Sequence, residues 1–381
     1  MNILIDQAGF GNKGAELMFC SVVEVIKKRY PDAKIFAHKT DVLGSGKEFC
    51  TENGINYAVS GLRARIIYYL CKLALRLKLV RPKLERNFTL NSKIDIIIDA
   101  GGFRFGDQWR HRASTARRMR RYYNSFRKNC KMIFLPQSFG PFNDKYSIKT
   151  AKIALKHVSL VYARETSSLD YLKQIAPEKL KIDFKRDFTI LHKFDSMPYA
   201  LTKGDYIVFV INSKMITHLG KQEVDYVGYI SELIKDLIAK GEKVVLLNHE
   251  GAGDKKICVD VQQRTGLDVP IISNIRAMQI KNVIGGAKLL VSSRYHGVVS
   301  GIVQRVPTFC TSWSHKYNEL LSSFEISDNL LELTDIDAAK QKLSDALTNP
   351  QKYITKPEIL EREKSATEDM WKDIFAFIER S

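Results

Sequence analysis

The order of apolar runs along the chain limits its fold more than any other feature of the sequence. Short β-rich apolar runs alternate with longer amphipathic stretches, which is the pattern of a parallel sheet covered by helices. Runs such as YIVFVI are apolar on both faces, as a central strand requires when helices cover both sides. The predicted strands are Ile3–Asp6, Lys34–His38, Ile94–Ile98, Met132–Leu135 and Val158–Ala163 in the first half, and Tyr206–Ile211, Lys243–Asn248, Val269–Ile272, Ala287–Val291 and Thr308–Thr311 in the second.

Because both halves show this pattern, we expect an α/β protein with two doubly wound, Rossmann-like domains. A segment with Pro, Gly and no apolar period over 192–205 marks the seam between a domain over 1–195 and one over 205–350. A helical stretch over 356–381 follows the second domain. Ligands of such sheets bind at the carboxyl ends of strands, so the active site is expected in the interdomain cleft.

The sequence predicts a cytoplasmic protein. Its N-terminus, MNILIDQAGFGN, lacks the basic leader, apolar run and cleavage site of a secretory signal. No run of about 18 apolar residues is present, so no membrane span is expected. The six cysteines lie singly, without a CxxC pair, which is typical of reduced thiols and predicts no metal site.

The formal net charge of +18 is concentrated in two segments. Residues 61–83 contain seven Lys/Arg and no acidic residue, and residues 104–131 contain ten Lys/Arg and one Asp. The first segment predicts a basic amphipathic helix over 62–83, either an ordinary surface helix or one that contacts an anionic membrane. The second mixes Arg with Tyr and Phe, as nucleic-acid binders do, although a solvated helix face is the ordinary interpretation.

A glycine-rich loop, GFGNKG, follows the first predicted strand and precedes a predicted helix over 15–29. Gly9, Gly11 and Gly14 would let a phosphate approach the helix N-terminus. A bound NAD would also need an acidic residue at the end of the second strand, where this chain has His38 and Lys39. A tight turn beside another ligand is therefore favoured.

Two further loops follow strands of the first half. In DAGGFRFGDQW, Asp107 is a carboxylate among basic residues, which suits a base for a hydroxyl group or simply an ion pair with Arg104 or Arg110. In PQSFGPF, the prolines and Gly140 predict a rigid loop after residue 135 that presents Gln137 and Ser138 to a ligand or only closes the turn.

The most specific motif is VSSRYHG in the second half. Arg294, His296 and the helix opened by Gly297 place a guanidinium, an imidazole and free N–H groups at one strand-to-helix corner, which suits a small anion with an acid or base beside it. His315 and Lys316 start the next helix and could add a cation. Arg164 follows a strand of the first half, as a second anion ligand or as an ion pair with Glu165 or Asp187.

Taken together, GFGNKGAE, DAGGFRFGD, FLPQSFGPF, VYARETSSLDYL and SSRYHG with VPTFCTSWSHKYNELL resemble the polysaccharide pyruvyl transferase family over roughly residues 1–325. The resemblance implies a GT-B-like fold, phosphoenolpyruvate as donor, no further cofactor, and a saccharide acceptor bound on the side of the first domain. The product is a pyruvate ketal in a surface or capsular polysaccharide precursor.

The resemblance also assigns roles. Arg294 and Arg164 match donor-binding arginines, and His296 matches the proposed general acid. The reasoning from the residues themselves adds Lys316, His315, Gly297, Asn12, Gln137 and Ser138 to the predicted substrate-binding set, and it leaves Asp107 or Glu16 to accept the hydroxyl proton. Many relatives carry an acid where this chain has Ala15, which weakens a catalytic role for the acids of that loop.

Other functions remain open at this stage. A GT-B glycosyltransferase that uses a nucleotide sugar could employ the same Arg/His corner. A non-catalytic binder of anionic lipid or nucleic acid is supported only by the two basic segments. For the transferase we expect a polyprenyl-diphosphate-linked saccharide as acceptor, met at the inner face of the cytoplasmic membrane, and no nucleic-acid partner.

Overall fold

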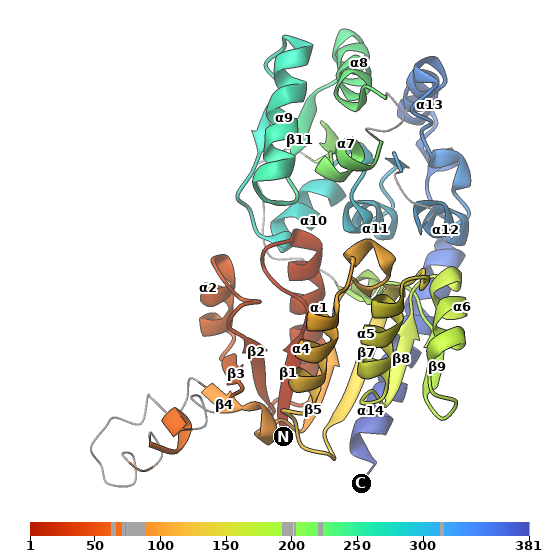
Figure 1. Ribbon diagram of the computed structural model, residues 1–381. Helices are drawn as coiled ribbons and strands as arrows, with labels where there is room; N and C mark the ends of the chain where they lie inside the picture. The colour runs from red at the N-terminus through yellow and green to blue at the C-terminus, as the bar shows by residue number, and fades with distance from the viewer. Residues whose placement is uncertain are drawn as a thin grey trace. The chain divides into compact units, whose positions relative to one another are not determined.

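The structure is a computed structural model in which residues 1–61, 66–70, 73, 88–192, 201, 203–219, 224–312 and 316–380 are described (Figure 1). The chain divides into two compact units, each described by itself. Unit 1 comprises residues 1–11, 18–189 and 366–381, and unit 2 comprises residues 12–17 and 190–365. The first turn of helix α1 therefore belongs to unit 2.

Unit 1 is built on a nine-stranded parallel sheet with the strand order β4-β3-β2-β1-β5-β7-β8-β9, and β6 pairs with β7. Its strands are β1 (Asn2–Asp6), β2 (Lys34–His38), β3 (Asn56–Val59), β4 (Phe88–Leu90), β5 (Ile96–Asp99), β6 (Phe103–Phe105), β7 (Lys131–Phe139), β8 (Leu160–Ala163) and β9 (Lys181–Phe184). Its helices are α1 (Lys13–Arg29), α2 (Ser45–Glu52), α4 (Ala113–Tyr123), α5 (Lys145–Leu155), α6 (Thr166–Ile175) and the last part of α14 (Pro357–Glu379).

Strand periodicity explains how this sheet is covered. Side chains of a strand alternate between its two faces, and Leu4, Ile97 and Phe134 all join one buried cluster with residues of α4 and α5. Their neighbours in the chain, including Ile3 and Ile98, are also fully buried. Figure 1 shows α4 and α5 over one face of β1, β5 and β7.

Unit 2 is built on a five-stranded parallel sheet with the order β12-β11-β10-β13-β14. Its strands are β10 (Ile207–Val210), β11 (Val244–Leu247), β12 (Ile271–Ile272), β13 (Leu289–Ser292) and β14 (Thr308–Cys310). Its helices are α7 (Ser213–Leu219), α8 (Tyr226–Ala239), α9 (Gly251–Thr265), α10 (Ala277–Gly285), α11 (Tyr295–Val303), α12 (Lys316–Ser323) and α13 (Ile336–Thr348).

In the central strand β10, successive side chains alternate between the two faces of the sheet. Ile207 and Phe209 pack against α8, α9 and α13 on one face of the sheet. Val208 and Val210 pack against α10 on the other face. Helices therefore cover both faces, as the doubly apolar strands predicted.

The strand orders confirm the predicted α/β class with two doubly wound sheets. In unit 1 the chain builds outward from β1 through β2, β3 and β4 and then returns to the other side of β1 with β5. Unit 2 does the same from β10, returning with β13. The point where the direction reverses is where ligands bind in such sheets, outside the carboxyl ends of the strands. The two candidate regions are therefore the ends of β1 and β5 and the ends of β10 and β13.

One predicted loop is wrong. The segment of Gln137 and Ser138 is not a turn after residue 135, because β7 continues through Pro136 to Phe139. Proline lacks an amide hydrogen and is tolerated in a strand at an irregularity. The pairing of β7 with β8 shifts register between Phe134 and Gln137, which accommodates Pro136 there.

Much of the predicted basic helix over 62–83 lies outside the described residues. Residues 66–70 are helical. Within the described part of the chain, no helix is long and apolar enough to cross a membrane.

Candidate functional site

The corner between β13 and α11 in unit 2 holds the most specific motif. Arg294 is the N-cap residue of α11 and is 8% exposed. Its Nε donates to Oδ2 of Asp254 at 2.8 Å and its Nη2 donates to Oδ1 of the same carboxylate at 2.5 Å. Its Nη1 donates to Glu250. Burial lowers the pKa of Arg294 to about 10, so the guanidinium remains charged at neutral pH.

The two carboxylates that hold Arg294 differ in accessibility. The side chain of Asp254 on α9 is fully buried and also accepts a hydrogen bond from the backbone N–H of Ser213. The side chain of Glu250 is 33% exposed. Asp254 is therefore the buried partner of Arg294, and Glu250 is the partner that is more open to water.

His296, the second residue of α11, packs against the glycine-rich loop. A methyl group added to Gly14 would lie 2.8 Å from Cγ of His296 and closer still to Nδ1. Real side chains do not approach so closely, so the imidazole requires glycine at this position. Gly14, the third glycine of the GFGNKG motif, thus leaves room for the ring of His296. This packing explains the glycine without a bound phosphate.

The residues around Gly14 have structural partners. Oδ1 of Asn12 accepts the backbone N–H groups of Gly14 and Ala15, which caps α1. Glu16 is buried, its Oε2 lies 2.6 Å from Nζ of Lys13, and its Oε1 accepts the backbone N–H of Ala277 at the start of α10. Both carboxylate oxygens of Glu16 are thus engaged within unit 2, and its role as a base stays a prediction.

Lys316 lies beside the same corner. Its Nζ is 5.8 Å from the ring centroid of Tyr295, the residue between Arg294 and His296, and 5.8 Å from that of Tyr317. Gly297 is buried, and a Cβ there would lie 2.5 Å from Oγ of Ser292. The predicted ligand His315 lies outside the described residues.

Sequence reasoning missed three residues of this corner: His249, Glu250 and Asp254. His249 follows β11, the neighbour of β10 in the sheet, and is 4% exposed. Burial, together with the positive charges of Arg294, His296 and Lys13, holds the pKa of His249 well below its usual range. The run HEGAGD directly after a predicted strand was the signal that could have found all three.

In unit 1, Arg164 is the centre of a buried network. Its Nε donates to Glu165 at 2.9 Å, its Nη1 to Asp187 at 3.2 Å and its Nη2 to Oγ of Ser138 at 2.8 Å. The hydroxyl of Ser138 in turn donates to Glu165. The side chain of Arg164 is 3% exposed. The structure therefore shows the ion-pair alternative for Arg164, and the roles of Arg164 and Ser138 as ligands stay predictions.

Asp107 also has structural partners. Its carboxylate accepts the backbone N–H groups of Asn143 and Asp144 and the side-chain amide of Asn143, at 2.8 to 3.1 Å. Burial acts to raise the pKa of Asp107, but the hydrogen bonds together outweigh it and hold the pKa below its ordinary value. A carboxylate stabilised in its ionised form is a weaker base, and its predicted role remains untested.

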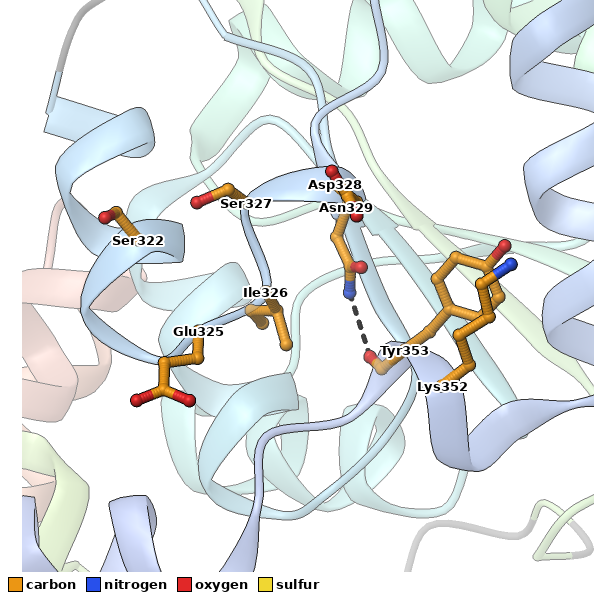
Figure 2. Close-up of a pocket in the computed structure, with 8 residues that line it drawn as sticks. All are labelled: Ser322, Glu325, Ile326, Ser327, Asp328, Asn329, Lys352 and Tyr353. Carbon is orange, nitrogen blue, oxygen red and sulfur yellow. Dashed lines mark hydrogen bonds between the residues drawn. The ribbon is translucent and has the colours of Figure 1, made fainter.

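A separate pocket of about 350 Å³ in unit 2 is lined by residues 322, 325–329, 352 and 353 (Figure 2). Asn329 donates to the backbone oxygens of Thr308 and Tyr353, and Lys352 pairs with Asp345. Its best-placed polar groups are thus already bonded within the fold. None of the residues predicted from the sequence to bind substrate lines it.

Solved structures share this fold. A putative UDP-N-acetylglucosamine 2-epimerase from Listeria monocytogenes aligns over 100% of this chain and 97% of its own, with a TM-score of 0.61 and 8% identity. The UDP-GlcNAc 2-epimerase from Methanocaldococcus jannaschii aligns over 99% and 100%, with a TM-score of 0.59 and 11% identity. The Neisseria meningitidis enzyme bound to UDP-GlcNAc gives 0.59 and 10%, over 99% and 100%.

The chain is thus an α/β protein with the fold of GT-B-type sugar enzymes. A family model narrows this class. The model described as polysaccharide pyruvyl transferase matches residues 12–315, so the chain belongs to that family and is a transferase. A search of curated proteins finds no match. The resemblance expected from the motifs is confirmed.

Proposed function

We propose that the protein transfers the enolpyruvyl group of phosphoenolpyruvate to two hydroxyl groups of a saccharide, giving a pyruvate ketal and phosphate. The corner of Arg294, His296 and Lys316 carries this proposal, together with the family match. Phosphoenolpyruvate holds a carboxylate and a phosphate on one small frame and needs fixed cations to bind it.

Arg294 can supply such a cation while its guanidinium keeps its orientation. Asp254 holds Nε and Nη2 of the guanidinium, which fixes its orientation. Glu250 pairs with Nη1, and its side chain is one-third exposed. An anionic group of the donor would displace it from Nη1. Lys316 adds a second positive charge beside Tyr295.

His296 is suited to the acid step. As imidazolium it would protonate the methylene carbon of the donor while an acceptor hydroxyl attacks the adjacent carbon. Phosphate then leaves, and the second hydroxyl closes the ketal. The ring of His296 packs closely against Gly14, which limits the positions that the imidazole can take.

The test is product analysis with phosphoenolpyruvate and a panel of methyl hexosides. We expect phosphate release together with a saccharide product that carries the mass of a pyruvate ketal. Transfer of a sugar from UDP-GlcNAc, without phosphate release from phosphoenolpyruvate, would contradict the proposal and favour a glycosyltransferase.

We further propose that the segment over 61–83 brings the enzyme to an anionic membrane, where a polyprenyl-diphosphate-linked saccharide would be met. Ile66, Ile67, Tyr69, Leu70 and Leu73 are each at least 50% exposed. The seven basic residues of the same segment complement anionic lipid. Large apolar side chains grouped in this way are typical of an interaction surface.

Flotation with phosphatidylglycerol vesicles tests the membrane contact. We expect wild type to float and a variant with Arg65, Lys72 and Arg76 changed to Gln to float less. A matched variant with the exposed residues Lys149, Lys152 and Lys156 changed to Gln removes the same charge elsewhere. Equal flotation of wild type and the first variant would contradict the membrane contact.

A further inference from the structure

The loop after β11 begins helix α9 beside Arg294. His249 lies two positions after the last residue of β11, and α9 begins two positions further on, at Gly251. Strands β11 and β13 both pair in parallel with β10, so the loops that follow them lie at one edge of the sheet of unit 2. Arg294 follows β13 at this edge and pairs with Glu250 and with Asp254 of α9. Its guanidinium therefore lies against the first turn of α9.

The first turn of α9 is not capped by the side chain of its N-cap residue. Glu250 makes no capping hydrogen bond, and its carboxylate bonds to Arg294 instead. The next three residues, Gly251, Ala252 and Gly253, are exposed and have no polar side chain. The first N–H groups of a helix carry partial positive charge and suit an anion. With 15 residues, α9 is long enough to have this property.

A second, independent observation indicates a ligand beside this turn. His249 is 4% exposed, yet among the described residues no atom forms a hydrogen bond with its Nδ1. Oδ1 of Asn248, which is 8% exposed, likewise has no partner among those residues. Buried polar atoms without a hydrogen bond are unfavourable and need a specific explanation. A ligand that accepts a hydrogen bond from Nδ1 supplies that explanation for His249.

The surroundings of His249 keep its imidazole neutral. Burial, together with the positive charges of Arg294, His296 and Lys13, holds the pKa of His249 well below its usual range. All four residues belong to unit 2. A neutral imidazole has one N–H group and adds no charge. It can therefore donate one hydrogen bond to an anion that the neighbouring cations attract.

A phosphate group fits this set of donors. A phosphate monoester has nearly two negative charges at neutral pH and three strong acceptor oxygens. It can therefore accept hydrogen bonds from an imidazole, a guanidinium and helix N–H groups at the same time. A carboxylate has one charge and only two oxygens. The donors at this corner thus favour the phosphate group of phosphoenolpyruvate over its carboxylate.

We propose that His249, Nη1 of Arg294 and the first turn of α9 form the subsite for the phosphate group of the donor. The inference rests on the proposed pyruvyl transfer from phosphoenolpyruvate. One phosphate oxygen displaces Glu250 from Nη1, while Asp254 still accepts hydrogen bonds from Nε and Nη2 of Arg294. A second oxygen accepts the hydrogen bond of Nδ1 of His249. The third accepts from N–H groups at the start of α9.

Calorimetric titration with inorganic phosphate tests the subsite without an acceptor. His249→Phe keeps a ring at this position but removes its N–H group, so the Kd for phosphate should rise by about tenfold or more. His249→Asn keeps an amide N–H near the position of Nδ1 and should restore most of the affinity. Pyruvate, which has no phosphate group, should give the same result with wild type and His249→Phe. Equal phosphate affinity in wild type and His249→Phe would overturn the role of His249.

Ala252→Asp tests the first turn of α9 separately. A carboxylate at a helix N-terminus is stabilising, so this variant should resist urea at least as well as wild type. It should nevertheless weaken phosphate binding by about tenfold, because its charge lies where the anion binds. Ala338→Asp, in the first turn of α13, is the matched control and should keep the wild-type affinity. Unchanged phosphate binding by Ala252→Asp would exclude α9 from the subsite.

Nuclear magnetic resonance of ring-labelled histidine tests the contact itself. The signals of His249 are assigned by their loss in His249→Asn. We expect the Nδ1–H tautomer and a shift of the Nδ1 signal when phosphate is added. An unchanged Nδ1 signal at a phosphate concentration that saturates the calorimetric titration would contradict the contact.

Turnover of phosphoenolpyruvate with methyl hexosides separates the subsite from the proposed function. We expect His249→Phe to raise KM for phosphoenolpyruvate by about tenfold with a smaller change in kcat. If wild type turns over and His249→Phe matches it in KM and kcat, the subsite fails and the proposed function stands. If phosphate binding depends on His249 but phosphoenolpyruvate is not consumed, the subsite stands and the proposed function fails. If wild type binds neither phosphate nor phosphoenolpyruvate, both fail.

Discussion

Gly14 and His296 are in direct contact although 282 positions separate them in the sequence, and the imidazole of His296 fills the space that a side chain at position 14 would need. The contact joins the two motifs that the sequence singled out independently. It also accounts for the third glycine of the GFGNKG loop through packing.

Gly14→Ala should therefore displace His296. A displacement of about 1 Å at a catalytic group can cost about 100-fold in rate, so we expect turnover to fall by roughly 10- to 100-fold. Steady-state phosphate release measures the loss. Gly11→Ala in the same loop is the control, because its added methyl would meet no atom within 4 Å, and it should keep turnover within about twofold. Equal rates for both variants would contradict the packing role.

His296→Gln should separate chemistry from binding. Loss of a general acid lowers kcat by roughly 100-fold or more, whereas affinity for phosphoenolpyruvate should stay within about threefold. Single-turnover kinetics and calorimetric titration give the two quantities. A variant that retains the wild-type kcat would exclude the acid role.

Glu250→Gln should strengthen donor binding. The variant removes the exposed carboxylate that competes for Nη1 of Arg294 and leaves Asp254 in place. We expect the Kd for phosphoenolpyruvate to fall by about fivefold, a change of about 1 kcal/mol. Glu232→Gln, at an exposed position of α8, serves as control. Weaker binding by Glu250→Gln would show that Glu250 supports the donor instead.

Arg164→Met should destabilise unit 1. The change would leave the buried carboxylates of Glu165 and Asp187 without their cation, which typically costs about 3–5 kcal/mol. Urea unfolding measures the loss, and Lys173→Met, at an exposed ion pair of α6, should change stability by less than about 1 kcal/mol. Unchanged stability of Arg164→Met with loss of donor binding would indicate a ligand role.

Asp99 should make stability depend on pH. Its folded pKa of about 7 lies above the unfolded value of about 3.9, so between these values the folded state binds more protons than the unfolded state. The contribution of Asp99 therefore falls as pH rises from about 4 to 7. Unfolding free energies at pH 5, 6, 7 and 8 should show this slope in wild type, and it should be reduced in Asp99→Asn. Parallel curves for the two proteins would contradict the raised pKa.

The sequence predicted the central strands well because their apolar runs are long and doubly buried. It did not predict β3, β4, β6 and β9, which have only three or four residues and include half-buried or exposed positions. A weak apolar signal cannot mark such strands; pairing with the neighbouring strand defines them. Pro136 misled the interpretation of β7, because the register shift that accommodates a proline is a tertiary feature.

The candidate site shows the same limit. Arg294 and His296 were found because they lie two positions apart, shortly after one predicted strand. Asp254, which orients Arg294, lies on another helix 40 positions away, and only the fold brings it there. The proximity of His249 and Arg294 depends likewise on the pairing of β11 and β13 with β10, which the sequence does not specify.

The most direct test of the account is calorimetric titration of wild-type protein with phosphoenolpyruvate and with UDP-GlcNAc, repeated on Glu250→Gln. The account predicts binding of phosphoenolpyruvate, strengthened in the variant, and no binding of UDP-GlcNAc. Binding of UDP-GlcNAc with no heat from phosphoenolpyruvate would contradict the proposed donor.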